Sequence, residues 1–124
     1  MKLKRLTPML YTSHLNETVD FYTKQLGFTC GEMSEEWGWA SLFKDGVEIM
    51  LARPNEHTPF DKPSFTGSFY INTDKVDELW NELKDKVKIC YPIETFDYGM
   101  RDFAIYDNNG YMIQFGQDVA ELKK

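Results

Sequence analysis

The chain reads Trp39-Ala40-Ser41-Leu42-Phe43, then Asp45-Gly46, then Val47-Glu48-Ile49-Met50-Leu51-Ala52. The second run alternates between apolar and more polar residues, a period of two that is typical of a strand with one buried face. An Asp-Gly pair between two such runs predicts a hairpin, because tight hairpin turns need residues that tolerate positive φ. The stretch therefore predicts two antiparallel strands over 39–43 and 47–52.

The same pattern returns in the second half of the chain as Phe103-Ala104-Ile105-Tyr106, a turn at Asn108-Asn109-Gly110, and Tyr111-Met112-Ile113-Gln114-Phe115. The segments before each hairpin repeat as well. A strand over 6–12, a helix and a short strand over 28–33 precede the first hairpin. A strand over 68–72, a helix and a short strand over 88–90 precede the second. The sequence thus predicts the order βαβββ twice.

Both predicted helices carry an apolar stripe at helical spacing. The stripes are Leu15, Val19, Tyr22 and Leu26 in the first helix, and Val76, Leu79, Trp80, Leu83 and Val87 in the second. Asn16 is expected to cap the first helix, and Thr73 or Asp74 the second. Gly27 is expected to end the first helix in the left-handed conformation.

These elements predict an α+β fold in one domain over 1–124, with module one at about 1–54 and module two at about 65–118. The linker over about 55–64 contains Pro59 and Pro63, and Pro54 precedes it. A sheet that carries a helix on one face leaves its other face to be covered. Two modules can therefore curl into a curved mixed sheet around a cavity, either within one chain or across a dimer.

Composition excludes several classes of function. The chain has 14 Lys+Arg, 20 Asp+Glu and a net charge of −6, so nucleic acid is not an expected partner. The acidic balance serves solubility or mildly attracts a cationic ligand. The chain contains no apolar run of about 20 residues, so no membrane span is predicted. The unclustered Cys30 and Cys90, and the lack of an apolar signal-peptide core, predict a cytoplasmic protein.

Three motifs, in order, resemble the vicinal oxygen chelate superfamily of glyoxalases, bleomycin-resistance proteins and dioxygenases. They are Phe21-Tyr22-Thr23-Lys24-Gln25-Leu26-Gly27-Phe28, Val76-Asp77-Glu78-Leu79-Trp80, and Tyr98-Gly99-Met100-Arg101-Asp102-Phe103-Ala104-Ile105-Tyr106-Asp107-Asn108-Asn109-Gly110. The resemblance runs from Leu6 to Gln117 and implies the glyoxalase/bleomycin-resistance fold. The third motif is similar to the bleomycin-resistance-like branch, with Tyr98 where Trp is usual.

Enzymes of that superfamily hold a divalent metal, and the resemblance places the usual ligand positions on Thr7, Ser68 and Gln114. Two hydroxyls and an amide are poor ligands for a first-row metal ion. We therefore expect no metal, no other cofactor and no catalytic residue. His14 and His57 are expected in loops. The alternative is a divergent metal-dependent lyase or dioxygenase with an unusual ligand set such as Glu48 with Gln114.

Strand alternation predicts which side chains face the cavity. With Leu10, Ile49, Leu51, Ile113 and Phe115 against the helices, the cavity receives Thr7, Met9, Tyr11, Glu48, Met50, Ser68, Tyr70, Asn72, Met112 and Gln114. Aromatic, thioether and hydrogen-bonding groups together are typical of a small-molecule pocket. The alternative is an ordinary second core between two sheets.

Trp37 and Trp39 flank Gly38 and follow Glu35 and Glu36. They could stack on a flat ligand, with the carboxylates attracting a cation, or pack against a second subunit. The resemblance implies a homodimer whose crevices are lined by aromatic side chains at Trp37, Tyr98 and Tyr70. Arg101 is expected either to pair structurally, beside Asp102, or to meet an anionic group.

The sequence thus predicts a metal-free homodimer that sequesters an aromatic small molecule, and the acidic residues favour a cationic one. The predicted ligand contacts are Trp37, Trp39, Glu48, Met50, Tyr70, Tyr98, Met112 and Gln114. A third hypothesis is a protein whose fold serves interaction only, with the cavity filled by side chains.

Overall fold

The computed structural model describes residues 1–57 and 59–122. Thr58, in the predicted linker, and Lys123 and Lys124 lie outside the described residues. The chain divides into two compact units, Met1–Lys62 and Pro63–Lys124. Within the described residues, no helix is both long and apolar enough to cross a membrane.

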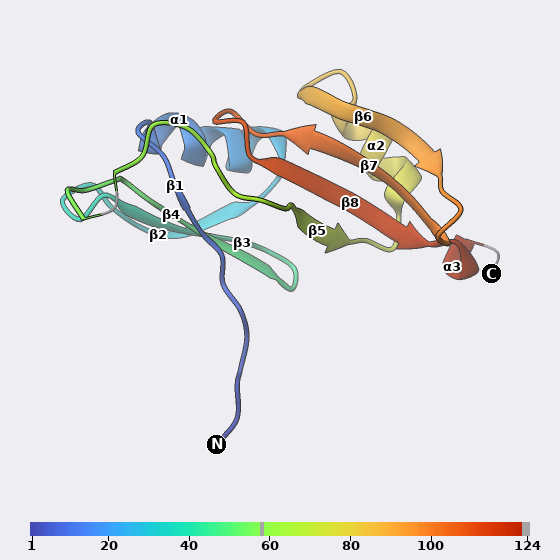
Figure 1. Ribbon diagram of the computed structural model, residues 1–124, viewed down its shortest axis with the longest axis horizontal. Coiled ribbons are helices and arrows are strands. Elements are labelled where there is room, and N and C mark those ends of the chain that lie inside the picture. Colours follow the sequence, from blue (N-terminus) through green and yellow to red (C-terminus); the bar gives the residue numbers. More distant parts are fainter. Residues whose placement is uncertain (58, 123–124) are drawn as a thin grey trace. The chain divides into compact units, whose positions relative to one another are not determined.

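The first unit is a four-stranded sheet with one helical segment against it (Figure 1). Its elements are β1 (Met9–Tyr11), α1 (Leu15–Asp20), the π-helical turn η1 (Phe21–Gln25), β2 (Thr29–Ser34), β3 (Trp39–Lys44) and β4 (Val47–Ala52). The strand order is β1-β4-β3-β2. β1 pairs in parallel with β4, and the other pairs are antiparallel.

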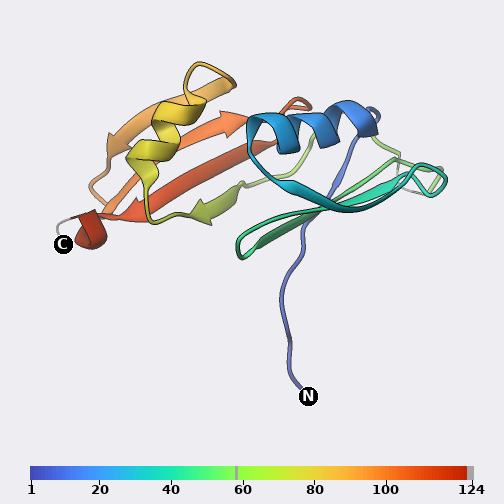
Figure 2. The ribbon, with the colours of Figure 1, turned by 180° about the vertical axis from the view of Figure 1, so that it is seen from behind.

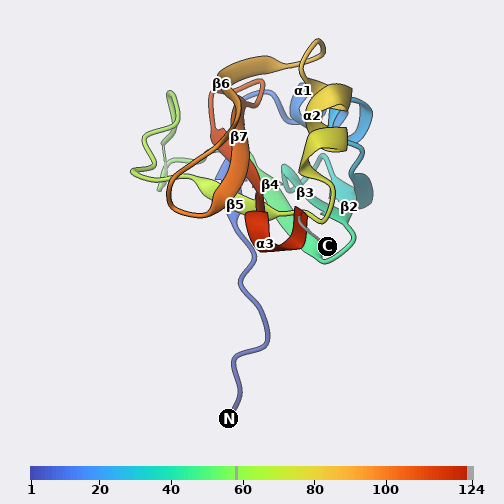
Figure 3. The ribbon, with the colours of Figure 1, turned by 90° about the vertical axis from the view of Figure 1, so that its right-hand side faces the viewer.

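The second unit repeats this arrangement. Its elements are β5 (Phe69–Asn72), α2 (Val76–Leu83), β6 (Lys88–Thr95), β7 (Met100–Tyr106), β8 (Met112–Asp118) and the short α3 (Val119–Leu122). The order is β5-β8-β7-β6, again with one parallel pair, β5 with β8. Helix α2 contacts β7 and β8 and covers one face of this sheet (Figures 2 and 3). The predicted α+β fold of two βαβββ modules is confirmed.

Sheet register shows which residues of the two modules are equivalent. Met50 pairs with Met9 and Ser41, while Gln114 pairs with Tyr70 and Ala104. By the same register, Trp39 lies opposite Ala52, and Asp102 lies opposite Gly116. Trp39 in module one is thus the structural counterpart of Asp102 in module two.

The predicted alternation of faces agrees with the burial of the side chains. The five residues predicted to face the helices, Leu10, Ile49, Leu51, Ile113 and Phe115, are all at most 5% exposed. The residues predicted for the opposite face are half-buried or exposed within each unit. The apolar stripe of the first helix is also buried, as are Val76 and Leu83 in the second.

Both predicted helix caps are wrong. Helix α1 begins at Leu15, after His14, whose N–H donates to Thr12 Oγ1 over 3.0 Å. Helix α2 begins at Val76, after Lys75, and no side chain of the cap residue caps it. Gly27 does follow the first helix with a φ of 78°, as expected for a left-handed residue.

A side chain from β8 holds the beginning of α2. The Val76 N–H donates to Gln117 Oε1 over 3.0 Å, and Gln117 Nε2 donates to the Asp74 carbonyl over 2.7 Å. Gln117 is only 5% exposed. Because a distant residue supplies the cap, local sequence around 73–76 could not reveal it.

We expect Gln117→Ala to lower the free energy of unfolding by about 1–3 kcal/mol, because it leaves a buried N–H and a carbonyl without partners. Urea unfolding monitored by circular dichroism measures the change. Gln25→Ala, at an exposed glutamine of η1, is the matched control and should change stability by less than about 0.5 kcal/mol. Equal effects of the two substitutions would contradict the cap.

Candidate functional site

A buried carboxylate surrounded by tyrosines lies on the face of the second sheet opposite α2. Asp102, in β7, is fully buried. Its Oδ2 accepts hydrogen bonds from the hydroxyls of Tyr70 (2.8 Å) and Tyr98 (2.7 Å), and its Oδ1 accepts one from Tyr91 (2.6 Å). Three O–H donors can satisfy the charge of a carboxylate removed from water, which would otherwise be costly to bury.

The hydrogen bonds continue from Tyr91 toward the edge of the sheet. Gln114 Nε2 donates to the Tyr91 hydroxyl oxygen over 2.9 Å, and the Ser68 hydroxyl donates to Gln114 Oε1. The chain of donors therefore runs from Ser68 through Gln114 and Tyr91 to Asp102. We call Ser68, Tyr70, Tyr91, Tyr98, Asp102 and Gln114 the tyrosine–carboxylate cluster. All its members belong to the second unit.

A glycine makes room for one of the tyrosines. A Cβ added at Gly116 would overlap the hydroxyl and ring of Tyr70. Gly116 lies in β8 directly opposite Asp102, so the absence of a side chain there lets the Tyr70 ring cross the strand to reach the carboxylate. No left-handed φ is required at this position, and the need for glycine is one of space.

Tyr98 comes from the turn between β6 and β7. Gly99, with a φ of 90°, closes the turn, and the Gly99 N–H donates to the Phe96 carbonyl over 3.1 Å. The rings of Phe96 and Tyr98 are stacked, with centroids 5.2 Å apart and planes 3° from parallel. Phe96 also meets Tyr91 edge to face at 5.7 Å. Tyr98 is nevertheless 63% exposed, so its ring offers an open aromatic surface.

The environment keeps these phenols protonated. Loss of solvent, and then the hydrogen bond to Asp102, raise the pKa of Tyr70, Tyr91 and Tyr98 above the ordinary value of 10. A phenolate would lose hydration and face the carboxylate, so the neutral form is favoured. The three phenols therefore stay protonated at neutral pH and can donate hydrogen bonds to Asp102.

The residues at the three usual metal-ligand positions, Thr7, Ser68 and Gln114, do not fit the divalent metal that the superfamily resemblance implies. Of the three positions, Ser68 and Gln114 are hydrogen-bonded to each other, and Gln114 also binds Tyr91. Gln114 Oε1 is thus occupied by a proton donor, and neither residue offers the imidazole or carboxylate that such an ion prefers. Thr7 precedes β1 in the first unit. Among the described residues, no group of three or more His, Cys, Asp or Glu is arranged to hold a metal ion.

The predicted contacts of the first unit lie on the sheet face opposite α1 or at its rim. Trp39, Met50 and Glu48 alternate with buried residues in β3 and β4, which places them on one face. Glu48 pairs with Arg5, with 3.5 Å between Glu48 Oε2 and Arg5 Nε. Trp37 lies in the turn before β3 and is 81% exposed.

The Trp37 turn is held by Arg53. The aliphatic carbons of Arg53 lie about 3.0 Å from where a Cβ at Gly38 would stand, and Gly38 has a φ of 64°. Arg53 Nη1 donates to the Glu35 carbonyl over 2.9 Å. These contacts fix the backbone and leave the Trp37 ring free to be covered.

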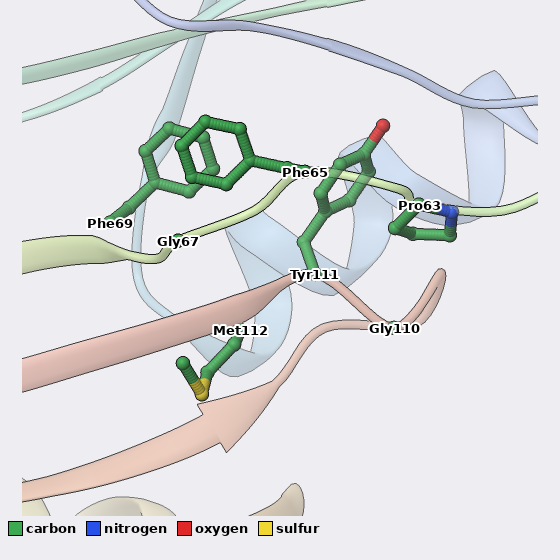
Figure 4. Close-up of a pocket in the computed structure, with 7 residues that line it drawn as sticks. All are labelled: Pro63, Phe65, Gly67, Phe69, Gly110, Tyr111 and Met112. Atoms are coloured by element: carbon green, nitrogen blue, oxygen red, sulfur yellow. The ribbon is translucent and has the colours of Figure 1, made fainter.

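Met112 lies apart from the hydrogen-bonded cluster. Its sulfur is 3.6 Å from Cys90 Sγ, which also reaches the Tyr106 hydroxyl at 3.2 Å. Met112 helps line a small pocket with Pro63, Phe65, Gly67, Phe69, Gly110 and Tyr111 (Figure 4). The rings of Phe65 and Phe69 stack there at 5.0 Å. At about 100 Å³ the pocket is smaller than the several hundred Å³ typical of drug-sized ligands, so it would hold no more than a fragment.

Arg101 pairs with Asp77 and not with Asp102, the neighbour considered in the sequence analysis. Its Nη2 and Nε contact Asp77 of α2 at 2.8 and 3.0 Å, and its Nη1 donates to Thr95 Oγ1 over 3.0 Å. Arg101 therefore ties β7 to α2, while Asp102 points to the opposite face. Of the two alternatives left open for Arg101, the structure shows a structural pair, but its partner is Asp77 and not Asp102.

Sequence reasoning missed Asp102, Tyr91 and Phe96. It placed the start of the strand at Phe103 and the end of the preceding strand at Cys90, whereas β7 begins at Met100 and β6 extends to Thr95. Asp102 alternates with the apolar Phe103, and this was the signal that could have placed it on the face opposite the helix.

Comparison with known proteins identifies the family. The family model described as Glyoxalase/Bleomycin resistance protein/Dioxygenase superfamily matches residues 3–115. Since this match spans most of the chain, the protein belongs to that superfamily. No curated protein sequence gives a significant match.

Solved structures with the same fold include proteins of different description. TioX from Micromonospora sp. ML1 is 18% identical, with a TM-score of 0.76 over 93% of this chain and 98% of that one. A superfamily member from Sphaerobacter thermophilus DSM 20745 is 19% identical, with a TM-score of 0.77 over 94% and 98%. A lactoylglutathione lyase from Agrobacterium tumefaciens is 15% identical, with a TM-score of 0.71 over 96% and 95%. At these identities the likeness establishes the fold alone.

We expect Gly116→Ala to displace Tyr70 and to lower the free energy of unfolding by about 1–3 kcal/mol, through steric overlap and the loss of one hydrogen bond to Asp102. Urea unfolding measures the change. Gly46→Ala is the matched control, because a Cβ there meets no atom within 4 Å. If the double substitution Tyr70→Ala/Gly116→Ala loses as much as the sum of its parts, the steric explanation fails.

Alkaline pH should destabilise the protein through the cluster. Because the folded-state pKa of Tyr91 is raised, its contribution is complete below pH of about 10 and is lost as the pH rises further, where unfolded tyrosines ionise. Urea unfolding at a series of pH values should show a steeper loss above pH of about 10 in the wild type than in Tyr91→Phe. Identical slopes would contradict the raised pKa.

Proposed function

We propose that this protein is a metal-independent small-molecule-binding protein that sequesters an aromatic compound, as members of the bleomycin-resistance-like branch do. The proposal includes no catalytic residue and no cofactor. It extends the superfamily assignment to one branch, and it does so on the chemistry of this chain's own side chains.

The observation that supports it most is the state of the two metal-ligand positions in the second module. Ser68 and Gln114 are committed to the hydrogen-bond chain that ends at Asp102. The same face offers no imidazole, since His14 and His57 both lie in the first unit, where both are exposed. Tyrosine rings with an amide and a hydroxyl beside them suit the binding of flat molecules.

The ligand contacts we propose come from both modules. Tyr70 and Tyr98 supply half-exposed and exposed aromatic surface in the second module, with Gln114 and Met112 on the same sheet. In the first module the corresponding face carries Trp39, Met50 and Glu48, with Trp37 at its rim. The proposed assembly is a homodimer, in which Trp37 and Tyr98 become covered by ligand or by the second copy. The net charge of −6 favours a cationic ligand.

The test is a fluorescence titration of the purified full chain with 9-aminoacridine, a planar cation. We expect saturable quenching of tryptophan fluorescence that EDTA does not change. Tyr98→Ala should weaken binding about fivefold or more, because it removes the exposed stacking surface. Leu122→Ala, which removes an exposed apolar side chain outside the sheet faces, is the control and should leave binding unchanged.

Two outcomes would overturn the proposal. One is a lack of saturation by 9-aminoacridine at millimolar concentration. The other is binding that EDTA abolishes and a divalent metal restores, which would favour a metal-dependent lyase or dioxygenase.

A further inference from the structure

The directions of the hydrogen bonds in the tyrosine–carboxylate cluster determine which ligand groups it can recognise. A carboxylate accepts hydrogen bonds and donates none. Asp102 therefore accepts hydrogen bonds from the hydroxyls of Tyr70, Tyr91 and Tyr98, and all three O–H bonds point inward. Each phenol oxygen keeps lone pairs that can only accept.

The same polarity extends to Ser68 and fixes the amide of Gln114. Tyr91 donates its proton to Asp102, so its oxygen must accept from the amide nitrogen of Gln114. The amide oxygen then faces Ser68 and accepts a hydrogen bond from that hydroxyl. A flipped amide would place its oxygen against the Tyr91 oxygen. Because Tyr91 already donates its proton to Asp102, no hydrogen would lie between these two oxygens. Every hydroxyl of the cluster thus points its proton into the protein.

We infer that the hydroxyls on this face of the second module select ligands that donate hydrogen bonds, such as ring N–H, amino or ammonium groups, and discriminate against ligands that offer only acceptors, for which the cluster keeps only the second N–H of the Gln114 amide. An acceptor atom placed against Tyr70, Tyr98 or Ser68 would meet lone pairs, and it would find no proton without breaking a bond to Asp102 or Gln114. This inference rests on the proposed function, because it concerns which molecules the same site accepts.

The side chains that carry these hydroxyls are partly exposed on this face. Tyr98 is 63% exposed and Tyr70 is 38% exposed. Ser68 and Gln114 are half-buried. In the proposed contact, a neutral N–H donor approaches a phenol oxygen while its ring packs against the exposed side chain of Tyr98, which is stacked on Phe96. The selectivity arises from proton direction, and it should persist for ligands without charge.

Substitution of the carboxylate by an amide tests the origin of the selectivity. In Asp102→Asn one side-chain atom becomes an N–H₂ donor of nearly the same shape. If the nitrogen faces Tyr70 and Tyr98, both hydroxyl protons are released. If it faces Tyr91, the amide of Gln114 must turn over and the Ser68 proton is released. Either orientation turns at least one hydroxyl proton of the face outward.

The experiment compares indole with benzofuran, a neutral pair of similar shape in which an N–H donor replaces an oxygen acceptor. Ligand-observed NMR, which detects millimolar affinities, measures binding of each to the full chain. We expect the wild type to prefer indole about fivefold or more, the effect of one net hydrogen bond. In Asp102→Asn the preference should vanish or reverse.

Two further variants test the inference if Asp102→Asn fails to fold. Tyr98→Phe removes one exposed acceptor and should weaken indole binding without weakening that of benzofuran. Tyr106→Phe removes a hydroxyl that contacts Cys90 and lies outside the cluster, and it should preserve the preference.

Equal binding of indole and benzofuran by the wild type would overturn the inference, and binding of 9-aminoacridine would then leave the proposed function standing. An unchanged indole preference in both Asp102→Asn and Tyr98→Phe would also overturn it. If neither probe binds while 9-aminoacridine does, the inference alone fails. If none of the three binds, both proposals fail.

Discussion

The convergence of three tyrosine hydroxyls on the buried Asp102 carboxylate is the constraint from which the rest of the second module follows. A carboxylate at zero exposure needs donors, and the sheet supplies them from β5, β6 and the turn before β7. Gly116 must be glycine so that Tyr70 can cross β8. The turn at Gly99 brings Tyr98 back over the strand. The cluster thus explains residue choices on four separate elements.

The two modules share a backbone pattern but differ in the chemistry of their open faces. Sheet register makes Trp39 the counterpart of Asp102, Met9 that of Tyr70 and Met50 that of Gln114. At each of these positions the first module carries an apolar side chain where the second carries a polar one. The repeat has therefore kept its core positions while its open faces diverged, one toward apolar contact and one toward directed hydrogen bonds.

Local sequence predicted much of the fold because its determinants are local. Apolar periodicity gave both helices, and the Asp45-Gly46 and Asn109-Gly110 turns gave both hairpins. Strand alternation also assigned Tyr70 and Gln114 to the open face, where the structure places them. The elements that failed depend on distant partners. Gln117, in strand β8, caps helix α2. Strand β6 continues past Pro92 with an irregular register against β7, although a proline is expected to interrupt a strand.

The candidate site was only partly predictable for the same reason. An aspartate next to an arginine suggests a surface pair, yet Arg101 binds α2 and Asp102 turns to the other face. Alternation could have placed Asp102 there, but the number of tyrosines that reach it depends on pairing between strands far apart in sequence. The direction of each hydrogen bond depends in turn on the buried carboxylate, which no sequence pattern encodes.

Neutron diffraction from a deuterium-exchanged crystal tests the central claim most directly, because it locates the exchanged hydroxyl atoms themselves. We expect deuterium on Tyr70, Tyr91 and Tyr98 directed at Asp102, on Ser68 directed at Gln114, and none on the carboxylate. Deuterium on an Asp102 oxygen, or tyrosine O–D bonds directed toward solvent, would contradict it.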